Sequence, residues 1–214
     1  MSDRANEKER FLADLEVGRP PISPALLKAV AELSREAFLP VSGARSFAPG
    51  PVPIDCGETM PDATTAVRLV SLLDLQPENM VLEIGTGSGY ITALMTRIAL
   101  HVTTLDRYRR LLSKAEAALK RADVTNVTLV HADGAEGYLD GAPYDRIIVH
   151  AAFPSPPRIF LDQMKQQARL ICAVGPGDEA QMLVRLTRVG SRFEREDLWP
   201  VYYQPLGSGL AKVL

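Results

Sequence analysis

The sequence predicts an α/β fold whose core is a doubly wound, mostly parallel sheet of seven strands, with a helical extension at the N-terminus. Three observations support this prediction. From residue 80 onward, short apolar runs alternate with helical segments of 10 to 15 residues, which is typical of βαβ units. The run Ile147–Val149 is continuously apolar, as expected for a strand covered on both faces. The apolar run Met80–Ile84 ends directly in a glycine cluster.

Three helices are expected before the sheet. A charged segment, Glu7–Glu16, is ended by the sequence Gly18-Arg19-Pro20-Pro21. Ser23 followed by Pro24 is a typical N-cap and first helical residue, and it predicts a second helix that extends to about Phe38. Apolar residues at spacings of three to four form one stripe along this helix, namely Leu26, Val30, Leu33 and Ala37.

A segment rich in proline and glycine, Leu39–Pro61, separates the second helix from the third, which is expected at Asp62–Leu73. Irregular segments of this length in compact domains are usually functional or disordered. We therefore expect residues 1–61 to form N-terminal helices and a loop that covers the substrate. They would belong to the same domain as the cofactor-binding core, residues 62–214.

The remaining elements follow in regular alternation, and the last two strands are expected to pair near the sheet edge. The predicted strands are Met80–Ile84, His101–Leu105, Val127–His131, Arg146–Val149, Leu170–Val174, Met182–Arg188 and Trp199–Gln204. The predicted helices are Gly89–Ala99, Arg107–Arg121 and Pro157–Gln166.

Composition narrows the function classes. The 214 residues carry a net charge of −2 with no strong basic block, which argues against a nucleic-acid partner held by phosphate contacts. The two cysteines are far apart and lack the spacing of zinc ligands, so no metal site is expected. No apolar run is long enough to span a membrane, and no secretory signal is recognisable, so a cytoplasmic location is expected. A monomer and a homodimer both remain open.

The sharpest motif is the loop that follows the strand Met80–Ile84. It contains Gly85, Thr86, Gly87, Ser88 and Gly89, and Glu83 precedes it. This pattern predicts a nucleotide-like cofactor at the carboxyl ends of the strands. The third glycine of a dinucleotide fingerprint would fall one place later, at Tyr90.

Two further acidic residues follow the next two strands. Asp106 comes about 20 residues after the first glycine, the usual position of a ribose ligand. Asp133, followed by Gly134, is placed to accept a hydrogen bond from an adenine amino group. Carboxylates suit a cofactor without phosphate, and they would repel a pyrophosphate. S-adenosylmethionine is therefore favoured over a nicotinamide dinucleotide, and a dehydrogenase is a minor alternative.

An ordered series of motifs resembles the protein-L-isoaspartate O-methyltransferase family over nearly the whole chain. The matching segments are Arg35–Pro40, Val81–Tyr90, Asp106, Ala132–Gly134, Pro143–Val149, Ala151–Ala152, Gln163–Met164, Val174–Gly175, Gln181 and Pro205–Leu206. The resemblance implies a Rossmann-like methyltransferase fold and binding of S-adenosylmethionine. It also implies methyl transfer to the α-carboxyl of L-isoaspartyl residues in damaged proteins, which starts their repair.

The expected substrate loop departs from the family pattern. The family's active-site serine falls on Pro61, its aspartate on Pro49 and its glutamine on Glu58. A carboxylate is already ionised at neutral pH, so the reaction needs orientation rather than a general base. Thr59 is the candidate for that catalytic role. Thr59, Met60, Pro61 and His150 are the candidate substrate-binding residues.

Three alternatives to isoaspartyl methyl transfer follow from these departures and from the cofactor loop. The first is a methyltransferase that acts on a different carboxylate in a peptide or protein. The second is a catalytically weak protein that binds S-adenosylmethionine and regulates a partner. The third is the nicotinamide dehydrogenase, against which Tyr90 argues.

Overall fold

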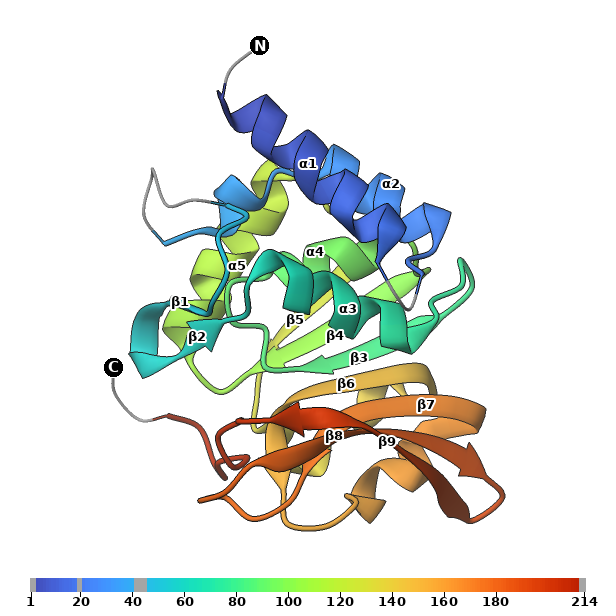
Figure 1. Cartoon of the computed structure of the whole chain (residues 1–214). Helices are drawn as coiled ribbons and strands as arrows, with labels where there is room; N and C mark the ends of the chain where they lie inside the picture. The colour runs from blue at the N-terminus through green and yellow to red at the C-terminus, as the bar shows by residue number, and fades with distance from the viewer. Residues whose placement is uncertain (1–2, 19–20, 41–45, 212–214) are drawn as a thin grey trace.

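The computed structural model describes residues 3–18, 21–40 and 46–211. Its centre is a seven-stranded sheet in the order β5-β4-β3-β6-β7-β8-β9 (Figure 1). The first five of these strands are parallel, and β8 and β9 are antiparallel to their neighbours. The strands are β3 (Met80–Ile84), β4 (His101–Asp106), β5 (Val127–His131), β6 (Tyr144–Phe153), β7 (Met164–Val174), β8 (Gln181–Val189) and β9 (Arg192–Val201). The predicted fold class is confirmed.

The N-terminal helices form as predicted, with one correction. Helix α1 spans Asp3–Val17, and α2 spans Pro24–Glu32 rather than extending to Phe38. Leu33 has extended backbone, and a 3₁₀ turn, η1 (Arg35–Phe38), follows. With the helix broken there, the centre of the Phe38 ring lies 5.8 Å from the centre of the Tyr90 ring. This tertiary contact overrides local helix propensity. Arg19 and Pro20 of the predicted break lie outside the described residues.

The proline-rich segment before the third helix is organised around a short hairpin. Strand β1 (Val52–Pro53) pairs with β2 (Thr59–Met60), and the 3₁₀ turn η2 (Asp55–Gly57) joins them. Asp55 forms ion pairs with Arg110, at 3.2 Å, and with Lys114. These contacts tie the hairpin to helix α5 (Arg109–Arg121). Residues 41–45 of the predicted loop lie outside the described residues.

Helix α3 (Ala63–Leu73) begins where the sequence predicts, because the Asp62 side chain accepts a hydrogen bond from the Thr65 amide at 3.0 Å. Helix α4 (Tyr90–Thr96) is shorter than the predicted Gly89–Ala99. The predicted helix Pro157–Gln166 is wrong: it is a 3₁₀ turn, η5 (Arg158–Gln163), and Met164 already belongs to β7. Pairing of Met164 with Tyr144 of β6 takes these last residues into the sheet.

The last strand is also displaced from its prediction. Strand β9 ends at Val201 and does not extend to Gln204. It begins at Arg192, after a turn at Gly190, which has φ +63°. Its first half carries charged residues, which is how exposed edge strands commonly appear in sequence. The aromatic signal at Trp199–Gln204 therefore marked the end of the strand and the segment beyond it.

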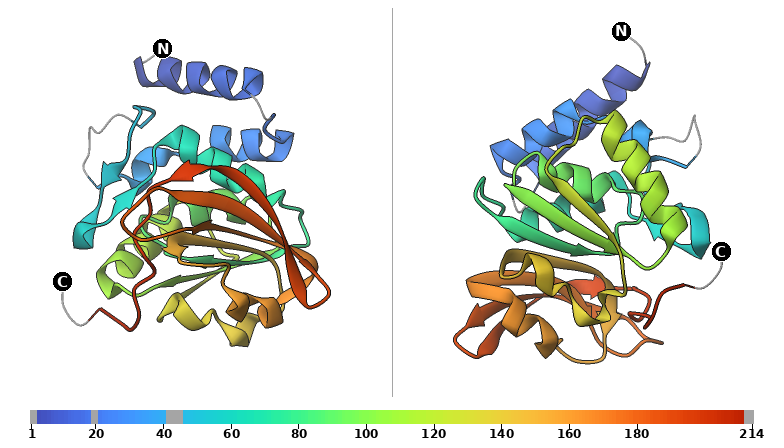
Figure 2. Two further views of the ribbon diagram at one scale, coloured as in Figure 1. Left: turned by 60° about the horizontal axis from the view of Figure 1, so that its bottom comes forward. Right: turned by 180° about the vertical axis from the view of Figure 1, so that it is seen from behind.

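The two faces of the sheet are covered differently. Helices α1 to α5 lie on one side of the sheet, with α1 outermost (Figure 2). Apolar side chains of α1 to α4, and two of α5, belong to one core cluster on this side. The opposite face is covered by 3₁₀ turns, with Phe160 of η5 fully buried against Ile147 and Leu170. The turns η3 (Gly134–Glu136) and η4 (Leu139–Gly141) precede β6. Among the described residues, no helix is long and apolar enough to cross a membrane.

The thin covering of the second face gives a prediction about stability. Phe160→Ala should reduce the free energy of unfolding by about 3–5 kcal/mol, because it empties a buried aromatic site. The neighbouring Ile159 is 44% exposed, so Ile159→Ala should change it by no more than about 0.5 kcal/mol. Urea unfolding of both variants measures the difference. Equal losses would mean that η5 does not cover the core.

Candidate cofactor and substrate site

The glycine-rich loop lies between β3 and α4, at the carboxyl edge of the parallel strands. The amides of Gly85 and Thr86 both donate to the carbonyl oxygen of Leu105, at 2.8 and 3.1 Å, and so fix the loop against β4. Gly85 has φ +95°, and a Cβ there would lie 3.2 Å from the Cβ of His150. Glycine is therefore required both by the backbone and by the neighbouring strand.

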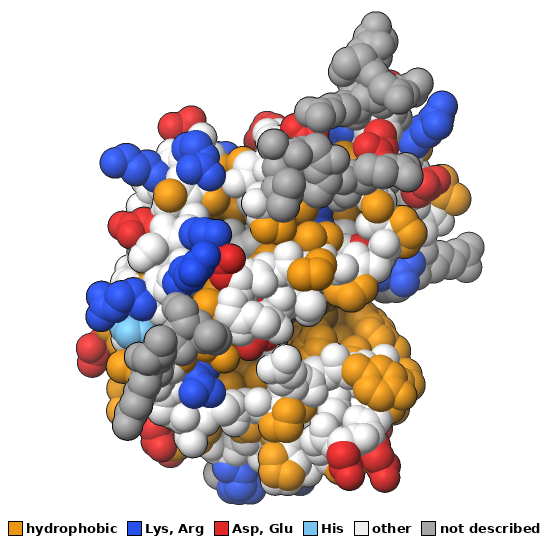
Figure 3. All heavy atoms as spheres, turned by 90° about the vertical axis from the view of Figure 1, so that its left-hand side faces the viewer, with side chains coloured by type: hydrophobic (Ala, Val, Ile, Leu, Met, Phe, Trp, Pro, Cys, Tyr) orange, Lys and Arg blue, Asp and Glu red, His pale blue; other side chains and the backbone are white. Residues whose placement is uncertain are grey.

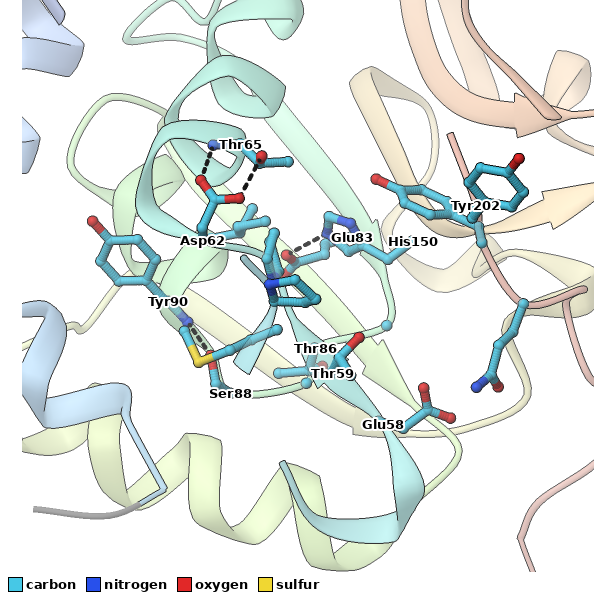
Figure 4. A pocket seen from close by; sticks show the side chains of 18 residues that line it. Glu58, Thr59, Asp62, Thr65, Glu83, Thr86, Ser88, Tyr90, His150 and Tyr202 are labelled. Carbon is cyan, nitrogen blue, oxygen red and sulfur yellow. Dashed lines mark hydrogen bonds and ion pairs between the residues drawn. The ribbon is translucent and has the colours of Figure 1, made fainter. Parts of the chain in front are cut away.

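Glu83 lies beneath the loop with no exposed surface. Its carboxylate accepts hydrogen bonds from the hydroxyls of Thr92 and Thr104, and from Nε2 of His150 at 3.2 Å. The Thr86 hydroxyl extends the network to Thr104, at 2.7 Å. A buried carboxylate is stable only with such partners. Glu83 thus orients His150 and borders a cavity at the carboxyl edge of the sheet (Figure 4).

Asp106 ends β4 and is 6% exposed. Its two carboxylate oxygens accept the backbone amides of Gly87 and Tyr108, both at 2.9 Å. Burial raises the pKa of Asp106, and the nearby Glu83 adds to this, although the two amide bonds lower it. The side chain therefore shapes the glycine loop, and it also borders a cavity at the strand ends.

Asp133 has two backbone partners, the amides of Ala135 at 2.9 Å and Gly209 at 2.5 Å. Asp133 is not among the residues that line this cavity, whereas its neighbour Gly134 is. A Cβ on Gly134 would come within 2.2 Å of the Ile84 side chain, so only glycine fits.

The cavity beside Asp106 has a volume of about 170 Å³. One side consists of the glycine loop, Leu105, Asp106 and Gly134, and the other of residues 204–207. This second wall is held by β6, because the Ala152 amide donates to Gln204 and the Leu206 amide donates to Ala152. We refer to this space as the cofactor cavity.

Sequence reasoning missed the contribution of residues 204–211 and of Arg107. The Arg107 guanidinium donates to the carbonyl oxygen of Ser208 at 3.3 Å, and the Ala211 amide donates to the Arg107 carbonyl at 3.2 Å. In the sequence Arg107 resembles a solvated residue at a helix start. The one available signal was Pro205–Leu206, a family motif without an obvious role.

A second cavity, of about 430 Å³, lies between the β1–β2 hairpin, α3 and the start of α4. Figure 3 shows a hollow bordered by hydrophobic side chains on the face that carries the hairpin. All four predicted substrate residues line this cavity, namely Thr59, Met60, Pro61 and His150. It shares several lining residues with the cofactor cavity, among them Glu58, Thr59 and His150. We refer to it as the substrate cavity.

The cavity wall at Pro61 is held from behind by Arg35. Arg35 is 2% exposed, and its guanidinium donates to the Pro61 carbonyl oxygen at 2.7 Å. It also lies 4.7 Å from the centre of the Tyr90 ring, in a cation–π contact. Within the described part of the chain, Arg35 Nε and Nη1 have no hydrogen-bond partner. This contact connects the substrate loop to the first residue of α4.

The predicted cofactor residues therefore divide into three groups. Gly85, Gly87, Asp106 and Gly134 line the cofactor cavity. Glu83, Thr86 and Ser88 line only the substrate cavity, and Ser88 accepts the Tyr90 amide at 3.3 Å. Gly89 and Asp133 line neither cavity. Across the described residues, no group of three or more His, Cys, Asp or Glu side chains is arranged to hold a metal ion.

The cofactor cavity suits S-adenosylmethionine on the chemistry of its lining. Asp106 supplies a buried carboxylate, a group that suits hydroxyl donors, and Leu105, Leu111 and Ala132 supply apolar surface of the kind on which an aromatic ring packs. A pyrophosphate would meet the Asp106 carboxylate, which already occupies the Gly87 amide. Tyr90, 2% exposed, fills the position of the third dinucleotide glycine.

Comparisons with known proteins agree with this geometry. A family model described as protein-L-isoaspartate(D-aspartate) O-methyltransferase matches residues 6–211. A protein-L-isoaspartate O-methyltransferase of Dinoroseobacter shibae is 38% identical over 188 residues, which cover 87% of each chain. One of Rhizobium meliloti is also 38% identical and covers 90% of this chain and 95% of its own.

Solved structures share the fold. A protein-L-isoaspartate O-methyltransferase superposes with a TM-score of 0.83 at 23% identity, covering 95% of this chain and 67% of the other. A Plasmodium falciparum structure described as the same enzyme, in complex with S-adenosyl-L-homocysteine, superposes with a TM-score of 0.75 at 20% identity. The match covers 95% of this chain and 96% of the other. With the family model matching nearly the whole chain, this protein belongs to the protein-L-isoaspartate(D-aspartate) O-methyltransferase family.

Proposed function

We propose that this protein transfers a methyl group from S-adenosylmethionine to the α-carboxyl of L-isoaspartyl residues in damaged proteins. The observation that carries the proposal is the pair of adjoining cavities, which meet at Glu58, Thr59 and His150. The cofactor cavity has a lining that suits S-adenosylmethionine, and the substrate cavity beside it has space for a peptide side chain. Relatives at 38% identity bear the name of this activity.

When bound, S-adenosylmethionine supplies an electrophilic methyl group on a sulfonium. We propose that Asp106 accepts the ribose hydroxyls and that Gly85, Gly87 and Gly134 allow close approach of the cofactor to the backbone. The role predicted for Asp133, acceptance of an adenine amino group, requires that its side chain reach the cofactor cavity, which it does not line in this structure. Glu83 contributes indirectly by holding His150.

At the junction, the chain's own groups orient the substrate carboxylate. The Thr59 hydroxyl is the candidate hydrogen-bond donor, because Pro61 at the family's serine position has none. Glu83 holds Nε2 of His150 at 3.2 Å and so sets the orientation of the imidazole ring, which borders both cavities. No proton needs to be removed, since the attacking carboxylate is already ionised. Orientation and exclusion of water are the main contributions of the protein.

The departures at Pro61 and Glu58 favour one second candidate, methylation of a different carboxylate in a peptide or protein. It uses the same two cavities and the same cofactor. A panel of methyl-accepting substrates separates the two.

The direct test uses methyl-labelled S-adenosylmethionine with a matched pair of peptides, one aspartyl and one isoaspartyl. The expected result is base-labile label on the isoaspartyl peptide alone. Label on neither peptide, with S-adenosylhomocysteine bound in calorimetry, would exclude isoaspartyl repair and leave the second candidate.

A second prediction concerns the cofactor. Asp106→Asn should weaken S-adenosylhomocysteine binding by roughly 10- to 150-fold, because it removes the charge from a buried acceptor. The matched control is Asp123→Asn, at an exposed position with φ +54°, which asparagine also adopts readily. Calorimetric titration of both variants gives the ratio. Unchanged affinity in Asp106→Asn would remove Asp106 from the cofactor site.

A third prediction concerns Thr59. Thr59→Val keeps the shape but removes the hydroxyl, so kcat/KM for an isoaspartyl peptide should fall by about tenfold or more. Thr59→Ser should retain most activity, and S-adenosylhomocysteine affinity should stay within about twofold in both. Steady-state kinetics with calorimetry checks the pair. If the valine variant is as active as the wild type, the hydroxyl has no orienting role.

A further inference from the structure

The substrate cavity carries an uneven charge. Its lining includes three acidic residues, Glu58, Asp62 and Glu83, and among the described residues it includes no lysine or arginine. An isoaspartyl carboxylate is itself an anion, so this lining would disfavour it unless a cation accompanies it. The question is which of the three carboxylates faces an incoming peptide.

Two of the three are engaged by neighbouring groups. Glu83 is fully buried and accepts three donors. Asp62 caps α3, where one oxygen accepts the Thr65 amide at 3.0 Å and the other the Thr65 hydroxyl at 2.9 Å. Glu58 differs from both, because it borders both cavities at their junction. Figure 4 shows its carboxylate away from the pairs of cavity residues that the dashed lines join.

The backbone fixes the position of Glu58. Its amide donates to Asp55 at 3.2 Å, and its carbonyl oxygen accepts the Ile54 amide at 2.9 Å, within the β1–β2 hairpin. Asp55 in turn is tied to α5. The backbone of Glu58 is therefore fixed at the cavity junction by the hairpin and by the ion pairs that join the hairpin to α5.

The surroundings of Glu58 disfavour its charged form, so a nearby cation would stabilise it. Burial raises the pKa of the Glu58 carboxyl and Asp106 raises it further, against smaller opposing effects of Arg107 and a hydrogen bond from Tyr108. Arg107 lines the cofactor cavity, and its guanidinium is engaged with the Ser208 carbonyl oxygen. A positive charge supplied from the substrate side would stabilise Glu58 without displacing this contact.

A second feature of the cavity mouth suits the same partner. Tyr202 lines the cavity and is 82% exposed, so its ring face is open to solvent. Tyrosine is enriched on the surfaces by which proteins recognise other proteins. Tyrosine rings attract lysine and arginine side chains through cation–π contacts.

We propose that Glu58, aided by the Tyr202 ring, selects isoaspartyl sites that have a lysine or arginine side chain within two residues. This inference rests on the proposed function. The incoming cation neutralises Glu58, and the isoaspartyl carboxylate then reaches Thr59 without facing a net repulsion. Replacement of the family's glutamine by Glu58 is thus a determinant of specificity.

The test compares three isoaspartyl peptides that differ only at the residue after the isoaspartate, which is lysine, norleucine or glutamate. At pH 8 and low salt, the lysine peptide should exceed the norleucine peptide in kcat/KM by about five- to tenfold, and the glutamate peptide should fall below it. The preference should shrink in 0.5 M salt, because the charges lie near solvent, where added salt screens them. An aspartyl peptide with lysine should not react.

Three variants assign the effect. Glu58→Gln should bring the lysine and norleucine peptides within about twofold of each other, chiefly by raising kcat/KM for norleucine. Glu116→Gln removes the same charge from an exposed position on α5 and should leave the preference unchanged. Tyr202→Leu should lower kcat/KM for the lysine peptide alone, by about two- to fivefold.

The outcomes separate the inference from the proposed function. Equal rates for all three peptides in the wild type, or a full lysine preference in Glu58→Gln, would overturn the inference while isoaspartyl methylation stands. Failure to methylate any isoaspartyl peptide would overturn the proposed function and the inference with it.

Discussion

The site is organised around a carboxylate that has no contact with water. Glu83 is the penultimate residue of β3, the central strand of the parallel part of the sheet, and its hydrogen bonds reach α4, β4 and β6. An unpaired charge at that depth would be very unfavourable, so the donors must be present for the sheet edge to form. Folding and site geometry thus depend on the same contacts: Thr104 supports the loop through Thr86, and His150 faces the cavities.

The substrate side depends on different contacts, from parts of the chain that contribute no strand to the main sheet. Asp55 fastens the β1–β2 hairpin to α5, while Arg35 holds Pro61 and packs on Tyr90. The N-terminal residues therefore act through the backbone positions they impose on the hairpin. A proline at position 61 fits this arrangement, since its carbonyl oxygen is what Arg35 binds and its amide nitrogen has no hydrogen to satisfy.

Much of the fold could be predicted because the parallel strands are recognisable in the sequence as short apolar runs. Strands β3 and β5, for example, have the predicted limits. The failures have a common cause. The segment Pro157–Gln166 and the charged half of β9 take their structure from strand pairing with distant residues, which local sequence does not encode. In the site, the glycine loop and Asp106 could be found from spacing. Arg35 and residues 204–211 could not, because they act through backbone contacts to residues far away in the sequence.

The wall formed by residues 204–207 has a consequence for synthesis of the chain. A protein leaves the ribosome N-terminus first. The glycine loop, Asp106 and Gly134 therefore emerge about 70 residues or more before residues 204–207, which form the opposite wall of the cofactor cavity. Until that segment docks on Ala152 and Arg107, the ligand would meet an open groove in place of a closed cavity. A nascent chain that lacks residues 204–207 should therefore bind S-adenosylmethionine only weakly. Tight binding begins once this segment has been translated and has docked.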